Sequence, residues 1–89
     1  MKIVWDDAKR RSNLKKHGLD FADAAQLLAG VTCTIEDGRF AYSERRFITL
    51  GMLRDVVDVM AHTETAREIR VISMRKATRH EQTIYFENL

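Results

Sequence analysis

The second half of the chain consists of runs in which apolar residues alternate with polar ones. In the run from 45 to 53, for example, Ile48, Leu50 and Met52 occupy every second position. Alternation of this kind, with many β-branched and aromatic residues, is typical of β-strands. The same criteria predict strands at residues 2–5, 31–36, 45–53, 56–63 and 68–74. Because the breaks between the last four are too short for a crossover helix, we expect these four strands to pair antiparallel.

Two segments near the start of the chain have helical features. One begins at a capping aspartate, Asp6 or Asp7, and ends at Gly18, a residue suited to a left-handed helix cap. The other begins at a capping Asp20 and ends at Gly30. Apolar residues recur at helical spacing in this second segment and predict one buried stripe of Phe21, Ala24, Ala25 and Leu28, with Leu27 beside it.

The pattern turns helical again over residues 75–88. On such a helix the inward positions are Ala77, Ile84 and Tyr85, and the outward positions are Arg75, Lys76 and Arg79. Arg75 and Arg79 would lie one turn apart, where their charges repel unless an anion binds between them.

The element order is therefore β-α-α-β-β-β-β-α. It predicts a single α+β domain over residues 1–89, with two layers: a four- to five-stranded antiparallel sheet and helices packed on one side of it. The hydrophobic share of 45 % is typical of a folded domain rather than a disordered chain. No apolar run approaches the length of a membrane span, and no signal peptide is evident. A single cysteine, Cys33, suits a reducing compartment, so we expect a cytoplasmic protein with no membrane partner.

The net charge of +2 conceals two basic blocks. Residues 2–17 carry six Lys and Arg against two Asp, and residues 66–80 carry five against one Glu. The rest of the chain is acidic overall. Two basic blocks can converge on one polyanion, or they can be two solvated surfaces, and charge counting leaves both interpretations open.

The sequence contains none of the common signatures for a metal or a nucleotide cofactor. Its three histidines and Cys33 lack the spacing of a zinc site, and there is no Walker loop and no GxGxxG. We therefore predict no cofactor and no metal. We expect Cys33 to be a small buried hydrophobic residue, and His62 to be structural.

The remaining reactive residues match the needs of metal-free RNA cleavage. That reaction requires a base for the 2′-hydroxyl, an acid for the leaving 5′-oxygen and fixed cations around the phosphate. The candidates are Lys16, His17, Glu44, Arg70 and Arg75. Each has an alternative interpretation: Lys16 and His17 suit a helix C-terminus, and Glu44 can pair with a surface arginine. Arg70 can be partly buried and paired with Glu44 or Asp58.

Several motifs resemble the BrnT family of bacterial toxins. Trp5-Asp6, Asn13 and the KHG of residues 16–18, followed by Phe21 and Ala24, are similar to the family's opening WD…N-x-x-KHG-x-x-F-x-x-A. ERRFITLG at 44–51 is similar to its E-x-R-x-x-x-x-G strand, HTE at 62–64 to its T-E-R turn, and IRVISMRKAT at 69–78 to its IRIISARKAT signature. Glu81 and Tyr85 fit the closing E…Y, so the resemblance covers residues 5–85.

The resemblance implies a metal-independent endoribonuclease of a type II toxin–antitoxin system with a RelE-like fold, which cleaves RNA and inhibits translation. It also implies a BrnA-like ribbon-helix-helix antitoxin as partner, in a 2:2 heterotetramer that binds operator DNA. Carried onto matching positions, it implies an active site of Lys16, His17, Glu44, Arg70 and Arg75. The expected RNA contacts are Arg45, Arg67, Lys76 and Arg79.

The chain departs from the family pattern at two places. Thr65 and Ala66 stand where the pattern has Arg and Gly, and Arg67 is the next basic residue. Met74 replaces a small residue between Ser73 and Arg75, which adds bulk beside the expected site. These departures keep a second hypothesis open: a non-catalytic module that binds RNA or the antitoxin and acts in operon autoregulation.

Overall fold

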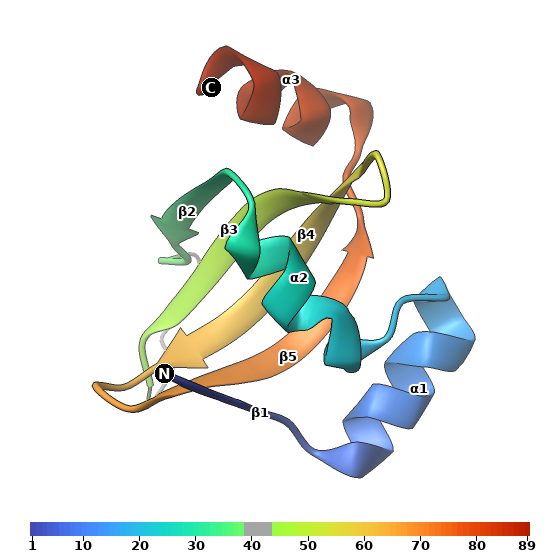
Figure 1. Ribbon diagram of the computed structural model, residues 1–89, viewed down its shortest axis with the longest axis vertical. Helices are drawn as coiled ribbons and strands as arrows, with labels where there is room; N and C mark the ends of the chain where they lie inside the picture. Colours follow the sequence, from blue (N-terminus) through green and yellow to red (C-terminus); the bar gives the residue numbers. More distant parts are fainter. Residues whose placement is uncertain (39–43) are drawn as a thin grey trace.

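The computed structural model describes residues 1–38 and 44–89 and contains one five-stranded sheet with helices around it (Figure 1). In chain order the elements are β1 (Lys2–Val4), α1 (Asp7–His17), the 3₁₀-helix η1 (Phe21–Asp23), α2 (Ala24–Ala29), β2 (Thr32–Glu36), β3 (Arg46–Leu53), β4 (Val56–Glu64), β5 (Glu68–Lys76) and α3 (Arg79–Glu87). The predicted element order and α+β class are confirmed. None of the helices in the described ranges has the length and apolar composition needed to cross a bilayer.

The strands lie in the order β1-β5-β4-β3-β2. β2, β3, β4 and β5 pair antiparallel, as their short connections require. β1 runs parallel to β5, with Val4 beside Arg70, so the expectation of a purely antiparallel sheet is wrong and the sheet is mixed. The argument from short breaks applies only to consecutive strands, whereas β1 joins the edge of a strand from the far end of the chain.

The expectation that all helices pack on one side of the sheet is also wrong. Neighbouring residues of β3 and β4 belong to two separate apolar clusters. One contains Phe21 and Leu27 of η1 and α2 with Leu53, Met60, Val71 and Met74; the other contains Tyr85 of α3 with Leu50, Val57, Val59 and Ala77. Because the central strands present apolar side chains on both faces, each face needs a cover. Figure 1 shows α2 across the front of the sheet and α3 beyond its upper end.

The second helical segment begins as a 3₁₀ turn, and this changes its buried stripe. Phe21, Ala24 and Leu27 are fully buried, whereas Ala25 is exposed and Leu28 is half-buried. Because side chains three residues apart share a face of a 3₁₀ turn, Phe21 aligns with Ala24, and the expected inward position of Ala25 is wrong. Leu27 packs over Gly51, where an added Cβ would lie 2.9 Å from its Cδ2 atom.

The last helix starts later than the sequence pattern predicts. Thr78 caps α3 and forms a capping box with Glu81, each accepting a hydrogen bond from the other's backbone N–H. Residues as far as Lys76 belong to β5 instead. Arg75 and Arg79 are therefore in different elements, and the expectation that they lie one helical turn apart is wrong, because the cap at Thr78 sets the helix start.

Helix α1 is docked on the sheet by a polar side chain. It is capped by Asp6 and by Gly18, which has a φ of 72°, as predicted, but its one buried residue is Asn13. The Asn13 amide donates to the carbonyl oxygens of Met74 (2.9 Å) and Leu19 (3.1 Å) and accepts from the Met74 N–H (3.2 Å). Since β1 pairs with β5 only as far as Arg70, Asn13 supplies a partner for the strand further along, at Met74.

A second polar contact closes the turn after α1. Arg10 binds both carboxylate oxygens of Asp20, at 2.7 and 2.9 Å. This pair and the Ala22 N–H lower the pKa of Asp20 to about 2. The turn that follows Lys16 and His17 is therefore held in place by an ion pair.

We predict that Asn13→Ala lowers the free energy of unfolding by about 2–3 kcal/mol, because it leaves the buried backbone groups of Met74 without their partner. Urea denaturation measures this loss. Lys15→Ala, on the exposed side of the same helix, is the control and should stay within about 0.5 kcal/mol of wild type. An Asn13→Ala loss as small as that of the control would contradict the docking role of Asn13.

Candidate functional site

One face of α1 looks onto the edge of β5 and encloses a hollow of about 280 Å³. Its lining residues are Lys9, Ser12, Asn13, Lys16, His17, Ile72 and Ser73. The helical residues among them are three to four positions apart, which places them on one side of α1. Two of the predicted site residues, Lys16 and His17, therefore lie together here, held by the Asn13 contact to β5.

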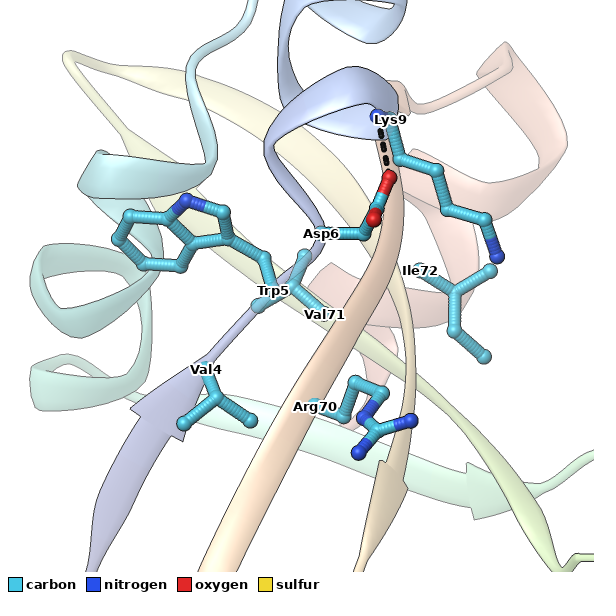
Figure 2. A pocket seen from close by; sticks show the side chains of 7 residues that line it. All are labelled: Val4, Trp5, Asp6, Lys9, Arg70, Val71 and Ile72. Carbon is cyan, nitrogen blue, oxygen red and sulfur yellow. Dashed lines mark hydrogen bonds between the residues drawn. The ribbon is translucent and has the colours of Figure 1, made fainter.

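A second hollow, of about 510 Å³, lies nearer the start of α1. It is lined by Val4, Trp5, Asp6, Lys9, Arg70, Val71 and Ile72. Figure 2 shows the side chains of Lys9, Arg70 and Ile72 on one side of β5, whereas the Trp5 indole points to the other side. There Trp5 packs against the core cluster of Phe21, so it is a partly buried core residue.

The two hollows adjoin, because Lys9 and Ile72 line both of them. Together we call them the α1–β5 groove. The groove carries the cations Lys9, Lys16 and Arg70 and the imidazole of His17. None of the four forms an ion pair with any residue in the ranges 1–38 and 44–89. The acidic residue of the lining, Asp6, accepts the Lys9 backbone N–H at 3.0 Å as the cap of α1.

Arg70 differs from the sequence-based expectation. It is exposed and has no carboxylate partner among the described residues, so the alternative interpretation, partial burial and pairing with Glu44 or Asp58, is wrong. Arg70 and its neighbour Thr63 lie at the end of the sheet away from the α3 contacts, and no helix buries Arg70 there. Asp58 is buried elsewhere in the sheet, where desolvation raises its pKa to about 6 although Lys76 and Arg54 oppose the shift.

Arg75 lies outside the groove. Its guanidinium binds both oxygens of Glu81, at 2.7 and 2.8 Å, and donates to the Lys76 carbonyl oxygen at 3.2 Å. The hydrogen bonds from Arg75 lower the pKa of Glu81 to about 2. The pair fastens the first turn of α3 to the end of β5. The predicted catalytic role of Arg75 stays a prediction.

The other predicted site residues line neither hollow. Glu44 is exposed at the start of the second described range. Arg45 binds Glu36 at 2.9 Å and lies over the Phe47 ring, 5.4 Å from its centroid. The other three are exposed: Arg67 in the turn between β4 and β5, Lys76 at the end of β5 and Arg79 at the start of α3. The structure does not bring these residues into the groove.

His62 has the structural role that the sequence suggests. It is fully buried, and its Nε2 is hydrogen-bonded to the Thr49 hydroxyl at 2.7 Å. Desolvation lowers its pKa, and its ring stacks on Phe47. Cys33, in contrast, is only half-buried. Among the residues that the structure describes, no three His, Cys, Asp or Glu side chains form a group suited to a metal ion.

The bulk of Met74 goes into the core rather than beside the site. Its side chain is fully buried in the cluster with Phe21, Leu27 and Met60. The expectation of added bulk next to the site is therefore wrong, because Met74 lies on the α2 face of the sheet. At the other departure, the Thr65 hydroxyl accepts hydrogen bonds from the backbone N–H groups of Arg67 and Glu68, at 3.3 and 3.1 Å.

Three polar residues of the groove, Lys9, Ser12 and Ser73, are not among the site residues that the sequence predicts. A signal for the first two was present, because they precede Lys16 by seven and four positions and so share its helix face. Ser73 carries no such signal. Its place beside α1 depends on the pairing of Asn13 with β5.

The Arg75–Glu81 pair gives a prediction for stability against pH. Because the pKa of Glu81 in the folded protein is below its ordinary value of 4.5, the pair stabilises the fold above about pH 4.5 and is lost as pH falls towards 2. We expect Glu81→Gln to lower the free energy of unfolding at pH 7, and the difference from wild type to shrink below pH 4.5. Urea denaturation over a pH series measures this, with exposed Glu87→Gln as control; a pH-independent difference would contradict it.

Comparison with known proteins identifies the family. A search of curated proteins gave no match to the chain. Residues 5–81, most of the chain, match a family described as the ribonuclease toxin, BrnT, of a type II toxin–antitoxin system. The matched range includes every residue of the α1–β5 groove except Val4. The chain therefore belongs to the BrnT family of type II toxin–antitoxin ribonuclease toxins.

Proposed function

We propose that the protein is an endoribonuclease toxin that binds RNA in the α1–β5 groove and cleaves it without a metal ion. The observation that carries the proposal is the convergence of Lys9, Lys16, His17 and Arg70 on one groove. These residues come from the two basic blocks, which are far apart in sequence. Cations gathered without a carboxylate partner in the described residues favour a bound polyanion.

The proposed reaction takes place at the smaller hollow, beside Lys16 and His17. The 2′-oxygen of the RNA attacks the adjacent phosphorus while its proton passes to a base. The bond to the 5′-oxygen then breaks, and this oxygen takes up a proton, leaving a 2′,3′-cyclic phosphate and a free 5′-hydroxyl. His17 is suited to one of the proton transfers, and the Lys16 ammonium stabilises the charge that builds on the phosphate oxygens.

Two further residues of the implied active site, Glu44 and Arg75, remain candidates for a role in the reaction. Glu44 is a second candidate for proton transfer, and Arg75 a second candidate for phosphate stabilisation. Arg45, Arg67, Lys76 and Arg79 are proposed contacts to RNA outside the groove, since all four are exposed. Arg70 lines the larger hollow next to the proposed site of cleavage.

Family membership supports the proposed biological role. RNA cleavage would inhibit translation, and a BrnA-like ribbon-helix-helix antitoxin would neutralise the toxin. The expected complex is a 2:2 heterotetramer that binds operator DNA through the antitoxin. A cationic groove is a suitable target for such a partner, because an antitoxin that covers it blocks access to RNA.

One observation favours a second candidate, a non-catalytic module that binds RNA or the antitoxin. The Arg75 guanidinium, expected to act on the phosphate, donates from both of its terminal nitrogens to the Glu81 carboxylate. A guanidinium so bound is less available to a phosphate. This candidate predicts salt-dependent RNA binding with no cleavage at any protein concentration.

We predict that the purified protein cleaves labelled RNA in EDTA, and that His17→Ala and Lys16→Ala lower kcat by about 100-fold and 10-fold or more. Lys15→Ala, on the same helix but outside both hollows, is the matched control and should remain within about twofold of wild type. A requirement for added Mg²⁺ would contradict the metal-free mechanism. Equal cleavage by wild type and His17→Ala would contradict the proposed site, and RNA binding without cleavage would favour the second candidate.

A pair of variants decides whether Arg75 acts on RNA or only on the fold. Glu81→Gln and Arg75→Ala both break the contact between β5 and α3, but only the latter removes the guanidinium. If Arg75 contacts the reacting phosphate, kcat of Arg75→Ala falls at least about tenfold below that of Glu81→Gln at equal folded fraction. Cleavage rates normalised by circular dichroism measure this. Equal rates for the two variants would restrict Arg75 to a structural role.

A further inference from the structure

We propose that Lys9 and Arg70, on either side of Ile72, form a second subsite that binds the phosphate of single-stranded RNA next to the one cleaved at Lys16 and His17. The inference rests on the proposed function, because that function defines the cleavage position. It assigns a role to Lys9, which lies outside the motifs that resemble the BrnT family. It also assigns Arg70 to the adjacent phosphate, whereas the family resemblance implies that Arg70 belongs to the active site.

The geometry of the larger hollow carries the proposal. Lys9 and Arg70 line it together, and their side chains extend on the same side of β5 as Ile72 (Figure 2). Neither cation has an ion-pair partner in the described parts of the chain. The Asp6 carboxylate accepts a hydrogen bond from the backbone N–H of Lys9 and caps α1. Two cations around one hollow repel each other until an anion binds between them.

The chemistry of the lining fits a nucleotide better than a free anion. A guanidinium offers two parallel donors to phosphate oxygens, and an ammonium adds a compact charge beside it. Ile72 and Val4 provide apolar surface within a hollow of about 510 Å³, which leaves room for more than a phosphate group. The sugar or base of the same nucleotide can pack on this surface.

The position of Lys9 makes the subsite adjacent to the cleavage site and distinct from it. Lys9 and Lys16 are seven residues apart on α1, a separation of roughly 10 Å along the helix axis. A single-stranded backbone carries one charge per nucleotide and can follow the groove from Lys16 to Lys9. Lys9 lines both hollows, so an RNA strand that extends from the smaller hollow into the larger one passes Lys9.

The first test compares substrates that differ by one phosphate. A dinucleoside monophosphate has only the scissile phosphate, whereas a trinucleotide extended on the 5′ or the 3′ side has one more. We expect one of the two extensions to raise kcat/KM of the wild-type protein about tenfold. Lys9→Ala and Arg70→Ala should reduce this gain towards one, while Lys15→Ala keeps it. A gain that persists in Lys9→Ala would overturn the proposal.

The second test does not depend on cleavage. A 2′-O-methyl oligonucleotide cannot react, so its Kd reports binding alone. We expect Lys9→Ala to raise Kd about tenfold at low salt and to reduce the slope of log Kd against log salt by about 0.7, the loss of one phosphate contact. Lys15→Ala should leave the slope unchanged. If Lys9→Ala binds like Lys15→Ala, the subsite is wrong; if the wild type binds but cleaves no RNA, the proposed reaction fails and the subsite stands.

Discussion

The contact of Asn13 with the backbone of Met74 holds the two sides of the α1–β5 groove together. Without it, α1 has no buried residue with which to attach itself to the sheet. A helix usually docks through an apolar stripe. Helix α1 instead uses the Asn13 side chain to bind backbone groups of β5, as a neighbouring strand would. Because the buried residue of α1 is one polar side chain rather than an apolar stripe, the rest of the same helix face remains open. That open face carries Lys9, Lys16 and His17.

The sheet presents two different environments to its charged residues. On the side of α3, Arg75 is bound by Glu81 and helps to hold the helix. At the edge beside α1, Arg70 has no carboxylate partner within the described residues. The two arginines belong to the same signature run and the same strand. Their difference arises because α3 supplies Glu81 to Arg75, whereas no helix buries Arg70. An arginine within a motif therefore does not by itself indicate contact with RNA.

Burial also separates two titratable residues of β4, Asp58 and His62, from the groove. Both side chains are almost completely inaccessible to solvent. Desolvation raises the pKa of Asp58 and lowers that of His62, and each shift favours the neutral form. His62 is linked through Thr49 to Thr34 of β2 by short hydrogen bonds. These groups tie the strands together. His17, in contrast, lies exposed at the end of α1 and lines the smaller hollow.

By itself the sequence determined the element order, the α+β class, the caps of α1, and the family, because these depend on local patterns and short motifs. It also identified Lys16, His17 and Arg70 as candidates. Only the tertiary structure decided that β1 pairs in parallel, that α3 covers the opposite face and that Lys9 and Ser73 join the groove. These features arise from contacts between residues far apart in the chain, such as Asn13 with Met74, which no local periodicity records. The start of α3 depends on both kinds of information. The sequence contains the capping box of Thr78 and Glu81, but only the structure shows that β5 continues to Lys76.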